Sequence, residues 1–193
     1  MTATTAVRWW PLVGLVGLAA VGLVVGTGST PLDDWFKRAG AAHPDLGRLL
    51  FFTDGRAIFA LWAVVLSVAL FRRLWRASAV IVVTPLIAVA AARLAKRVFG
   101  RYSDDQLAYP SGHTTLAVVV LGLAVLVAGV TAWSVALATV ATALAVLGQS
   151  FTYHYFTDTI GALFLGTALL CLSAVAAGLD RCQPRCDLHH SSG

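Results

Sequence analysis

Long runs of apolar residues recur along the chain, and short segments rich in polar residues separate them. Six such runs cover residues 9–25, 57–71, 77–95, 114–130, 132–147 and 159–179. Each run is close to the ~20 mostly apolar residues that a helix needs to cross a bilayer. The pattern predicts an all-α fold: a bundle of six transmembrane helices, forming a single domain over residues 1–193 with a short tail from about residue 180.

An even number of spans places both termini on one side of the membrane. Arginines cluster between the second and third runs and at the chain ends, at Arg8, Arg72, Arg73, Arg76, Arg181 and Arg185. Because cytoplasmic loops are enriched in Lys and Arg, we expect both termini to be cytoplasmic. The first run is interpreted as a span rather than a secretory signal peptide, since no clean cleavage signal follows it and other spans do.

Three segments then lie on the outer side, at residues ~28–56, ~96–113 and ~148–158, and they hold almost all of the unusual polar residues. The first mixes apolar and charged residues, namely Leu32, Asp33, Asp34, Trp35, Phe36, Lys37 and Arg38. That mixture is typical of a short amphipathic helix lying in the membrane interface. The alternative interpretation is a plain connector.

The composition excludes a soluble enzyme. Hydrophobic residues make up 59% of the chain and charged residues only 12%, whereas soluble domains carry about 25% charged residues. The net charge of +5 is spread over short loops, so we expect no nucleic-acid partner. Heavy use of Ala, Val and Arg indicates a GC-rich bacterium, which predicts an inner-membrane protein whose outer face is periplasmic.

The cysteine pattern predicts neither a disulfide framework nor a metal site. Cys171 lies in an apolar run, and Cys182 and Cys186 lie in the tail near His189 and His190. A short tail without packed partners does not fix metal geometry. Asp104 and Asp105 are adjacent, so their side chains point apart. We therefore predict chemistry without a metal or other cofactor.

Candidate chemistry begins with three residues that topology brings to the outer side. His154 and Asp158 are four residues apart, so they share a helix face. The carboxylate can accept the imidazole Nδ1 proton and leave Nε2 as a nucleophile. His113 lies on the same side of the membrane, because the chain crosses twice between it and His154. Protonated, His113 is a general acid for a departing oxygen.

Groups suited to an anion surround these three residues in the predicted topology. Ser111 and Gly112 precede a helix start, where a serine can cap the helix and free backbone N–H groups attract anions. Lys96, Arg97 and Arg101 would neutralise a transferring phosphoryl group. The combination predicts phosphoryl transfer.

Three blocks of sequence resemble the type 2 phosphatidic acid phosphatase superfamily, which includes vanadium haloperoxidases. They are KRVFGRYSD from Lys96, PSGH from Pro110 and HYFTD from His154. The resemblance implies that His154 forms a phosphohistidine, that Asp158 orients it and that His113 is the acid. It also implies that Lys96, Arg101, Ser111 and the amide of Gly112 hold phosphate oxygens. The implied substrate is a lipid phosphate or pyrophosphate of the phosphatidic acid, phosphatidylglycerophosphate or isoprenoid type.

The chain departs from the family pattern at two arginine positions. Ser103 stands seven residues after Lys96, where the family carries the arginine of its first block. Leu147 and Gly148 stand where the third block carries Ser-Arg. A charge-assisted contact to phosphate contributes about 1.5 to 3 kcal/mol, so losing two without replacement would slow transfer by several powers of ten.

Three explanations of these departures stay open. In the first, Arg93, Arg97 or Arg56 replaces the missing phosphate-binding arginines. In the second, the protein resembles lipid phosphotransferases of the sphingomyelin synthase kind, which use arginine less strictly. In the third, it is a catalytically impaired lipid-binding protein. A rival from another class is an intramembrane serine protease with Ser111 as nucleophile and His154 as base. Its GxSG motif is absent, because residue 109 is Tyr.

Overall fold

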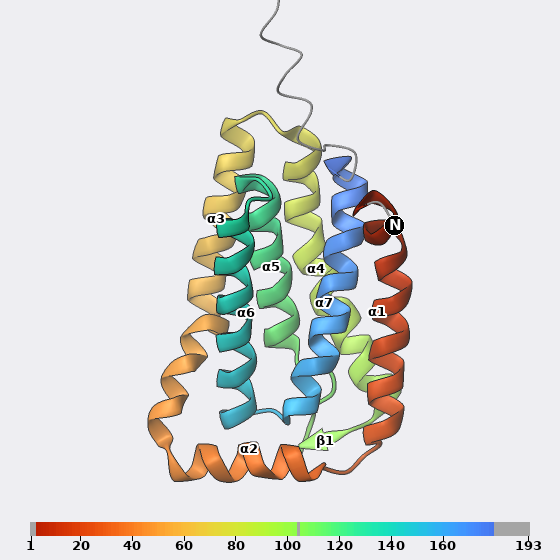
Figure 1. Ribbon diagram of the computed structural model, residues 1–193, viewed down its shortest axis with the longest axis vertical. Coiled ribbons are helices and arrows are strands. Elements are labelled where there is room, and N and C mark those ends of the chain that lie inside the picture. The colour runs from red at the N-terminus through yellow and green to blue at the C-terminus, as the bar shows by residue number, and fades with distance from the viewer. Residues whose placement is uncertain (1–2, 104, 180–193) are drawn as a thin grey trace, which may run out of the picture.

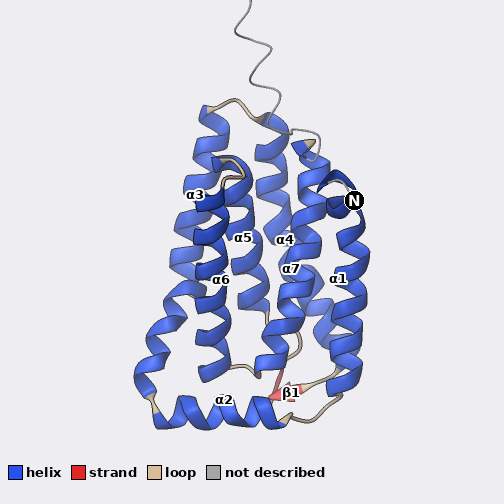
Figure 2. Ribbon diagram, in the orientation of Figure 1, coloured by secondary structure: helices blue, strands red, loops and turns tan. Residues whose placement is uncertain are grey.

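The computed structural model describes residues 3–103 and 105–179, and helices make up nearly all of that part (Figures 1 and 2). The elements are α1 (Ala3–Val25), α2 (Pro31–Ala42), the 3-10 helix η1 (Pro44–Thr53), α3 (Gly55–Phe71), α4 (Trp75–Phe99), β1 (Tyr102–Ser103), β2 (Gln106–Leu107), α5 (Gly112–Ala128), α6 (Ala132–Thr152) and α7 (Phe156–Ala177). Strands β1 and β2 pair as a small antiparallel hairpin. The all-α prediction is confirmed.

Five helices of the described chain are long and apolar enough to cross a membrane: α1, the continuous segment Pro44–Phe71 that joins η1 to α3, α4, α6 and α7. Apolar side chains on their outer faces are exposed, as for Val24 at 86%, Phe71 at 91% and Leu86 at 68%. An apolar exterior is what a bilayer solvates and water does not. These features are those of an integral membrane protein.

Helix α5 corresponds to the fourth predicted run, residues 114–130, and forms the centre of the bundle. At 17 residues it is shorter than each of the five candidate spans named above, and it packs against α3, α4, α6 and α7. Its side chains Ala117, Val119, Val120 and Leu123 are at most 2% exposed. Burial of these side chains removes apolar surface from solvent on every side of the helix and fixes the positions of its neighbours.

The two ends of the bundle differ in what they carry. The N-terminus of α1, the end of α7 and the α3–α4 turn lie at one end (Figure 1). Helix α2, η1, the β1–β2 hairpin and the α6–α7 turn lie at the other. The three segments predicted to share one side therefore do share one end of the bundle.

The predicted amphipathic helix is α2, which lies across one end of the bundle of long helices (Figure 1). A capping box between Thr30 and Asp33 begins it. Phe36 is buried, while Leu32 and Trp35 are about half exposed. The connector alternative is wrong. Asp33, one of the charged residues of this segment, is 0% exposed.

The sequence analysis missed η1. This 3-10 helix precedes α3 and lies against α6. The closest approach is at Gly148, where a Cβ atom would be 2.6 Å from the backbone carbon of Leu49. Only a glycine permits that distance. The absence of a side chain at residue 148 therefore lets η1 cover this face of α6.

Candidate active site

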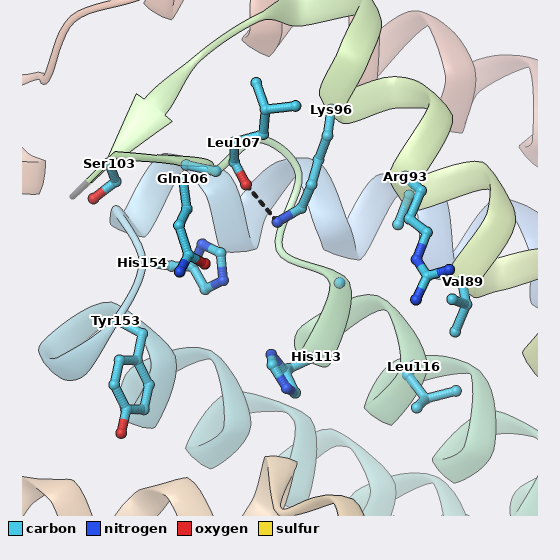
Figure 3. A pocket seen from close by; sticks show the side chains of 13 residues that line it. Val89, Arg93, Lys96, Ser103, Gln106, Leu107, His113, Leu116, Tyr153 and His154 are labelled. Atoms are coloured by element: carbon cyan, nitrogen blue, oxygen red, sulfur yellow. Dashed lines mark hydrogen bonds between the residues drawn. The ribbon is translucent and has the colours of Figure 1, made fainter.

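A cavity of about 620 Å³ opens at the α2 end of the bundle, between α4, the β1–β2 hairpin, the start of α5 and the α6–α7 turn. Its polar side chains come from Arg93, Lys96, Ser103, Gln106, His113 and His154. Figure 3 shows both imidazoles and the ammonium group of Lys96 directed into this space. Residues up to 65 positions apart in the region Val89–His154 thus meet at one cavity.

His154 lies in the turn between α6 and α7. Its backbone N–H donates to Gln149 O at 2.9 Å, which ties the turn to the end of α6. Its side chain is 13% exposed, and Nδ1 lies 3.5 Å from Oδ2 of Asp158. At that separation Nδ1 makes no hydrogen bond with any described residue. The predicted pair is adjacent, with a gap that must close by a few tenths of an ångström to form the bond.

Asp158 is fully buried in the first turn of α7 and holds several segments together. Its Oδ2 accepts from the Tyr155 N–H at 3.1 Å, and its Oδ1 accepts from Arg101 at 2.6 Å. Its backbone carbonyl accepts from the Ser111 N–H at 3.0 Å. The start of α5, which carries His113, is therefore bonded directly to the start of α7.

Ser111 is the N-cap of α5, as the sequence predicted. Its hydroxyl accepts from the backbone N–H of Thr114 at 3.4 Å, and Thr114 Oγ1 donates to it at 3.1 Å. The Ser111 side chain is 0% exposed and does not line the cavity, whereas Gly112 and His113 do. The first N–H groups of a helix have no intrahelical partner, so the cavity wall at Gly112 suits an anion.

Among the described residues, the Lys and Arg side chains that line the cavity are Arg93 and Lys96, and both belong to α4. Lys96 donates from Nζ to the carbonyl of Leu107 at 2.7 Å, and Arg93 lies about one turn before it along the helix. Of the three substitutes considered from sequence, Arg93 therefore lies at the cavity. Arg97 and Arg56 are exposed and are not among the residues that line it.

Arg101 corrects the sequence analysis, because it does not face the cavity. It is 1% exposed, and its five N–H groups are all used within the protein. Nε and Nη2 both donate to the carbonyl oxygen of Gly28, and Nη2 also donates to Asp33 at 3.0 Å. Nη1 donates to Thr157 Oγ1 and to Asp158. A guanidinium has five donors, so none is left for a phosphate.

The two departures from the family pattern have different surroundings. Ser103 is 9% exposed and lines the cavity, so a longer side chain there would extend into the cavity. Gly148 faces the backbone of η1, with Leu50 N only 2.9 Å from the position of a Cβ. One clamp position is therefore open to the cavity, and the other is closed by the fold.

Asp33 and Thr157 are the residues that sequence reasoning missed. Burial acts to raise the pKa of Asp33, but hydrogen bonds from Thr157 and Thr30 outweigh it and hold that pKa below its ordinary value. A signal did exist in the sequence. Asp33, Phe36 and Gly40 have the i, i+3, i+7 spacing of one helix face, so the apolar stripe of α2 includes a carboxylate.

Among residues 3–103 and 105–179, no group of three or more His, Cys, Asp or Glu side chains is placed to hold a metal ion. The cysteines and histidines of the tail, considered above, lie outside the described residues. Comparisons of the chain with protein-family models, curated proteins and solved structures find no match.

Proposed function

We propose that the protein is an integral membrane phosphatase that hydrolyses a lipid phosphate or pyrophosphate through a phosphohistidine on His154. The observation that carries this proposal is the convergence of His113, His154 and Lys96 on one cavity, with Asp158 buried directly behind His154. Two imidazoles beside a cation and a helix start are the groups that phosphoryl transfer through a nitrogen nucleophile needs.

In the first step, Nε2 of neutral His154 attacks phosphorus, and the bond from phosphorus to the lipid oxygen breaks. His113, protonated, gives its proton to that leaving oxygen. In the second step His113 takes a proton from water, whose oxygen attacks the phosphohistidine and releases inorganic phosphate with His154 regenerated. Asp158 stabilises the positive charge that develops on His154 during the first step.

The phosphate oxygens would be held by Lys96, by Arg93 and by the amide of Gly112. Arg93 replaces the arginine that is absent at residue 103 and extends from the opposite wall, on α4. Val89, Ala92 and Leu116 also line this cavity. These apolar walls suit the first carbons of a lipid chain, which a water-soluble phosphate ester does not provide.

We also propose that α5 is the sixth span and that the active site faces the periplasm. Seventeen residues of helix extend ~25 Å, close to the ~30 Å hydrocarbon core. The turn at residues 72–76 holds three arginines and no acid, as expected of a cytoplasmic turn.

In a background without the native cysteines, an impermeant thiol reagent should label His43→Cys in intact cells and Arg76→Cys only after permeabilisation. The reverse pattern would invert the topology.

The principal test is phosphate release by purified protein without added metal, from a panel of lipid phosphates and pyrophosphates in detergent. His154→Ala and His113→Ala should each reduce kcat by at least ~100-fold, because each removes a group that bonds to reacting atoms. His43→Ala is the matched control, since His43 is exposed at the same end of the bundle and outside the cavity. Unchanged turnover in His154→Ala would refute the assignment and favour a lipid-binding protein.

Lipid phosphotransfer is the second candidate, and the cavity wall at Ser103 and Gln106 favours it. These neutral hydrogen-bonding groups stand near the position where the family has an arginine, and they suit an acceptor alcohol. The same assay distinguishes the two activities when it is run with an added alcohol. A phosphotransferase would form a new phosphate ester at the expense of free phosphate, with the same requirement for His154.

The serine protease alternative is less favoured, because the Ser111 hydroxyl is fully buried and bonded within the start of α5. Ser111→Ala should retain phosphate release, whereas a protease would lose all turnover.

A further inference from the structure

Behind the cavity, three charged side chains form a buried network. Arg101 lies between the carboxylates of Asp33 and Asp158, at 3.0 Å and 2.6 Å, and the three side chains are at most 1% exposed. Asp33 belongs to α2, Arg101 follows α4, and Asp158 begins α7. The network therefore joins three segments that are far apart in the sequence, next to the α6–α7 turn that contains His154.

Most hydrogen-bond donors and acceptors of these three side chains are used within the protein. Asp33 accepts from the Thr30 N–H at 3.0 Å, from the Thr157 N–H at 2.9 Å and from the Thr157 hydroxyl, besides Arg101. The Thr157 hydroxyl also lies 2.7 Å from Arg101 Nη1. Buried charges are tolerated when they are paired and bonded in this way. Loss of one member leaves the others without compensation, so the network holds its geometry as a unit.

The orientation of Asp158 follows from this arrangement. Its Oδ1 is held by Arg101 and its Oδ2 by the Tyr155 N–H, which leaves the outer side of Oδ2 directed at His154 Nδ1. Arg101 in turn cannot rotate, because the carbonyl of Gly28 and Asp33 hold its far side. Asp33 is thus three contacts away from the imidazole, through Arg101 and Asp158.

Helix α2 also holds the turn that carries His154. The ring of Phe36 stacks on Phe156 with a centroid distance of 4.6 Å and contacts Phe151 at 5.0 Å. Those two residues lie on either side of the turn. Gly40, one turn further along α2, packs directly on the carbonyl of Phe151. One helix therefore contacts both sides of the His154 turn.

We infer that Asp33 is a positioning residue of the active site: through Arg101 it fixes Asp158, and so the ring of His154, which makes helix α2 a part of the catalytic apparatus. This inference rests on the proposed phosphohistidine reaction. Asp33 does not line the cavity and touches no substrate. It should therefore influence the rate of phosphohistidine formation and leave the affinity for the lipid phosphate unchanged.

The test is Asp33→Asn, measured with full-length protein on the lipid phosphate that the panel identifies. The amide keeps the size of the side chain and removes its charge. We expect kcat to fall about 10- to 100-fold, the range found when a group that orients an active-site ligand is lost. KM should stay within about threefold, because Lys96, Arg93 and Gly112 are untouched. Single-turnover labelling should show slower formation of the phosphoenzyme.

The matched control is Asp34→Asn, which removes the same charge from the next, partly exposed position of α2. It should stay within about twofold of the wild type in kcat and KM. Thr157→Val is the second variant, because it removes the hydroxyl that links Asp33 to Arg101 and keeps both charges. It should lower kcat several-fold with the thermal midpoint in detergent preserved.

The outcomes separate the inference from the proposed function. If the wild type releases no phosphate, the proposed function fails. If the wild type is active and folded Asp33→Asn keeps kcat within twofold, the positioning role is rejected while the phosphatase stands. If Asp33→Asn unfolds and Thr157→Val has wild-type kcat, the network serves stability alone, and the inference is likewise overturned.

Discussion

Two cations five residues apart, Lys96 and Arg101, serve two different regions of the molecule. Lys96 lies in the last turn of α4 with its ammonium group at the cavity, where Nζ donates to Leu107 O. Arg101 follows the left-handed Gly100 that ends α4, and its whole guanidinium is bonded behind Asp158. One short segment thus supplies a charge at the cavity and a charge buried in the scaffold. The backbone turn at Gly100, and not the spacing of the two residues, decides which cation faces the cavity and which is buried.

The largest difference between the two regions should appear in stability. Arg101→Ala leaves Asp33 and Asp158 buried with no cation between them, and removal of one partner of a buried pair costs about 3 to 5 kcal/mol in the free energy of unfolding. Arg97→Ala, at an exposed position, should change that free energy by less than about 0.5 kcal/mol. Denaturant unfolding in mild detergent measures both. A stable Arg101→Ala protein would contradict the scaffold role.

Lys96→Met should show the opposite behaviour. Methionine keeps most of the aliphatic length, so the fold should be retained, while one charged contact to phosphate is lost. That contact contributes about 1.5 to 3 kcal/mol, which lowers kcat/KM about 10- to 150-fold. Steady-state kinetics beside the same unfolding measurement checks this. An unchanged kcat/KM would mean that Arg93 alone holds the phosphate.

The difference between Lys96 and Arg101 also marks the limit of what the sequence could predict. Apolar runs were sufficient for the helices, since burial and span length depend on composition over many residues. The four-residue spacing correctly predicted that His154 and Asp158 are adjacent, but they do not share a helix face, because His154 lies in the turn before α7. Spacing could not reveal that Arg101 points away from the cavity, because that depends on Gly28 and Asp33, which come from another part of the chain.

The same reason explains the misses at η1 and α2. Segment 44–53 lacks the periodicity of an α-helix, and its position is fixed by contact with Gly148, about 100 residues later. The pattern of α2 did not distinguish Asp33 from the other charged residues of that helix, and a charge in an interfacial helix is usually solvated. The partners that bury it, Arg101 and Thr157, are tertiary. Long-range hydrogen bonds of this kind leave little trace in local sequence.

Residues 103 and 148, where the family pattern has arginine and this chain does not, allow a specific test of the difference between cavity and scaffold. Its expected effects are the smallest of those described. Ser103 lies on the buried side of β1 and Tyr102 on its exposed side, because side chains alternate along a strand. Ser103→Arg places a guanidinium at the cavity, where Lys96 already acts. We expect kcat/KM for the lipid phosphate to rise up to about tenfold, or ~1.4 kcal/mol of added phosphate contact.

Tyr102→Arg is the control for this prediction, since it adds the same charge outside the cavity and should leave kcat/KM unchanged. Gly148→Ala gives the contrasting case: its Cβ would meet the backbone of η1, so stability should fall by about 1 to 3 kcal/mol. If Ser103→Arg instead lowers kcat/KM in a stable protein, the cavity needs a neutral group at residue 103. That result would favour phosphotransfer to an alcohol over hydrolysis.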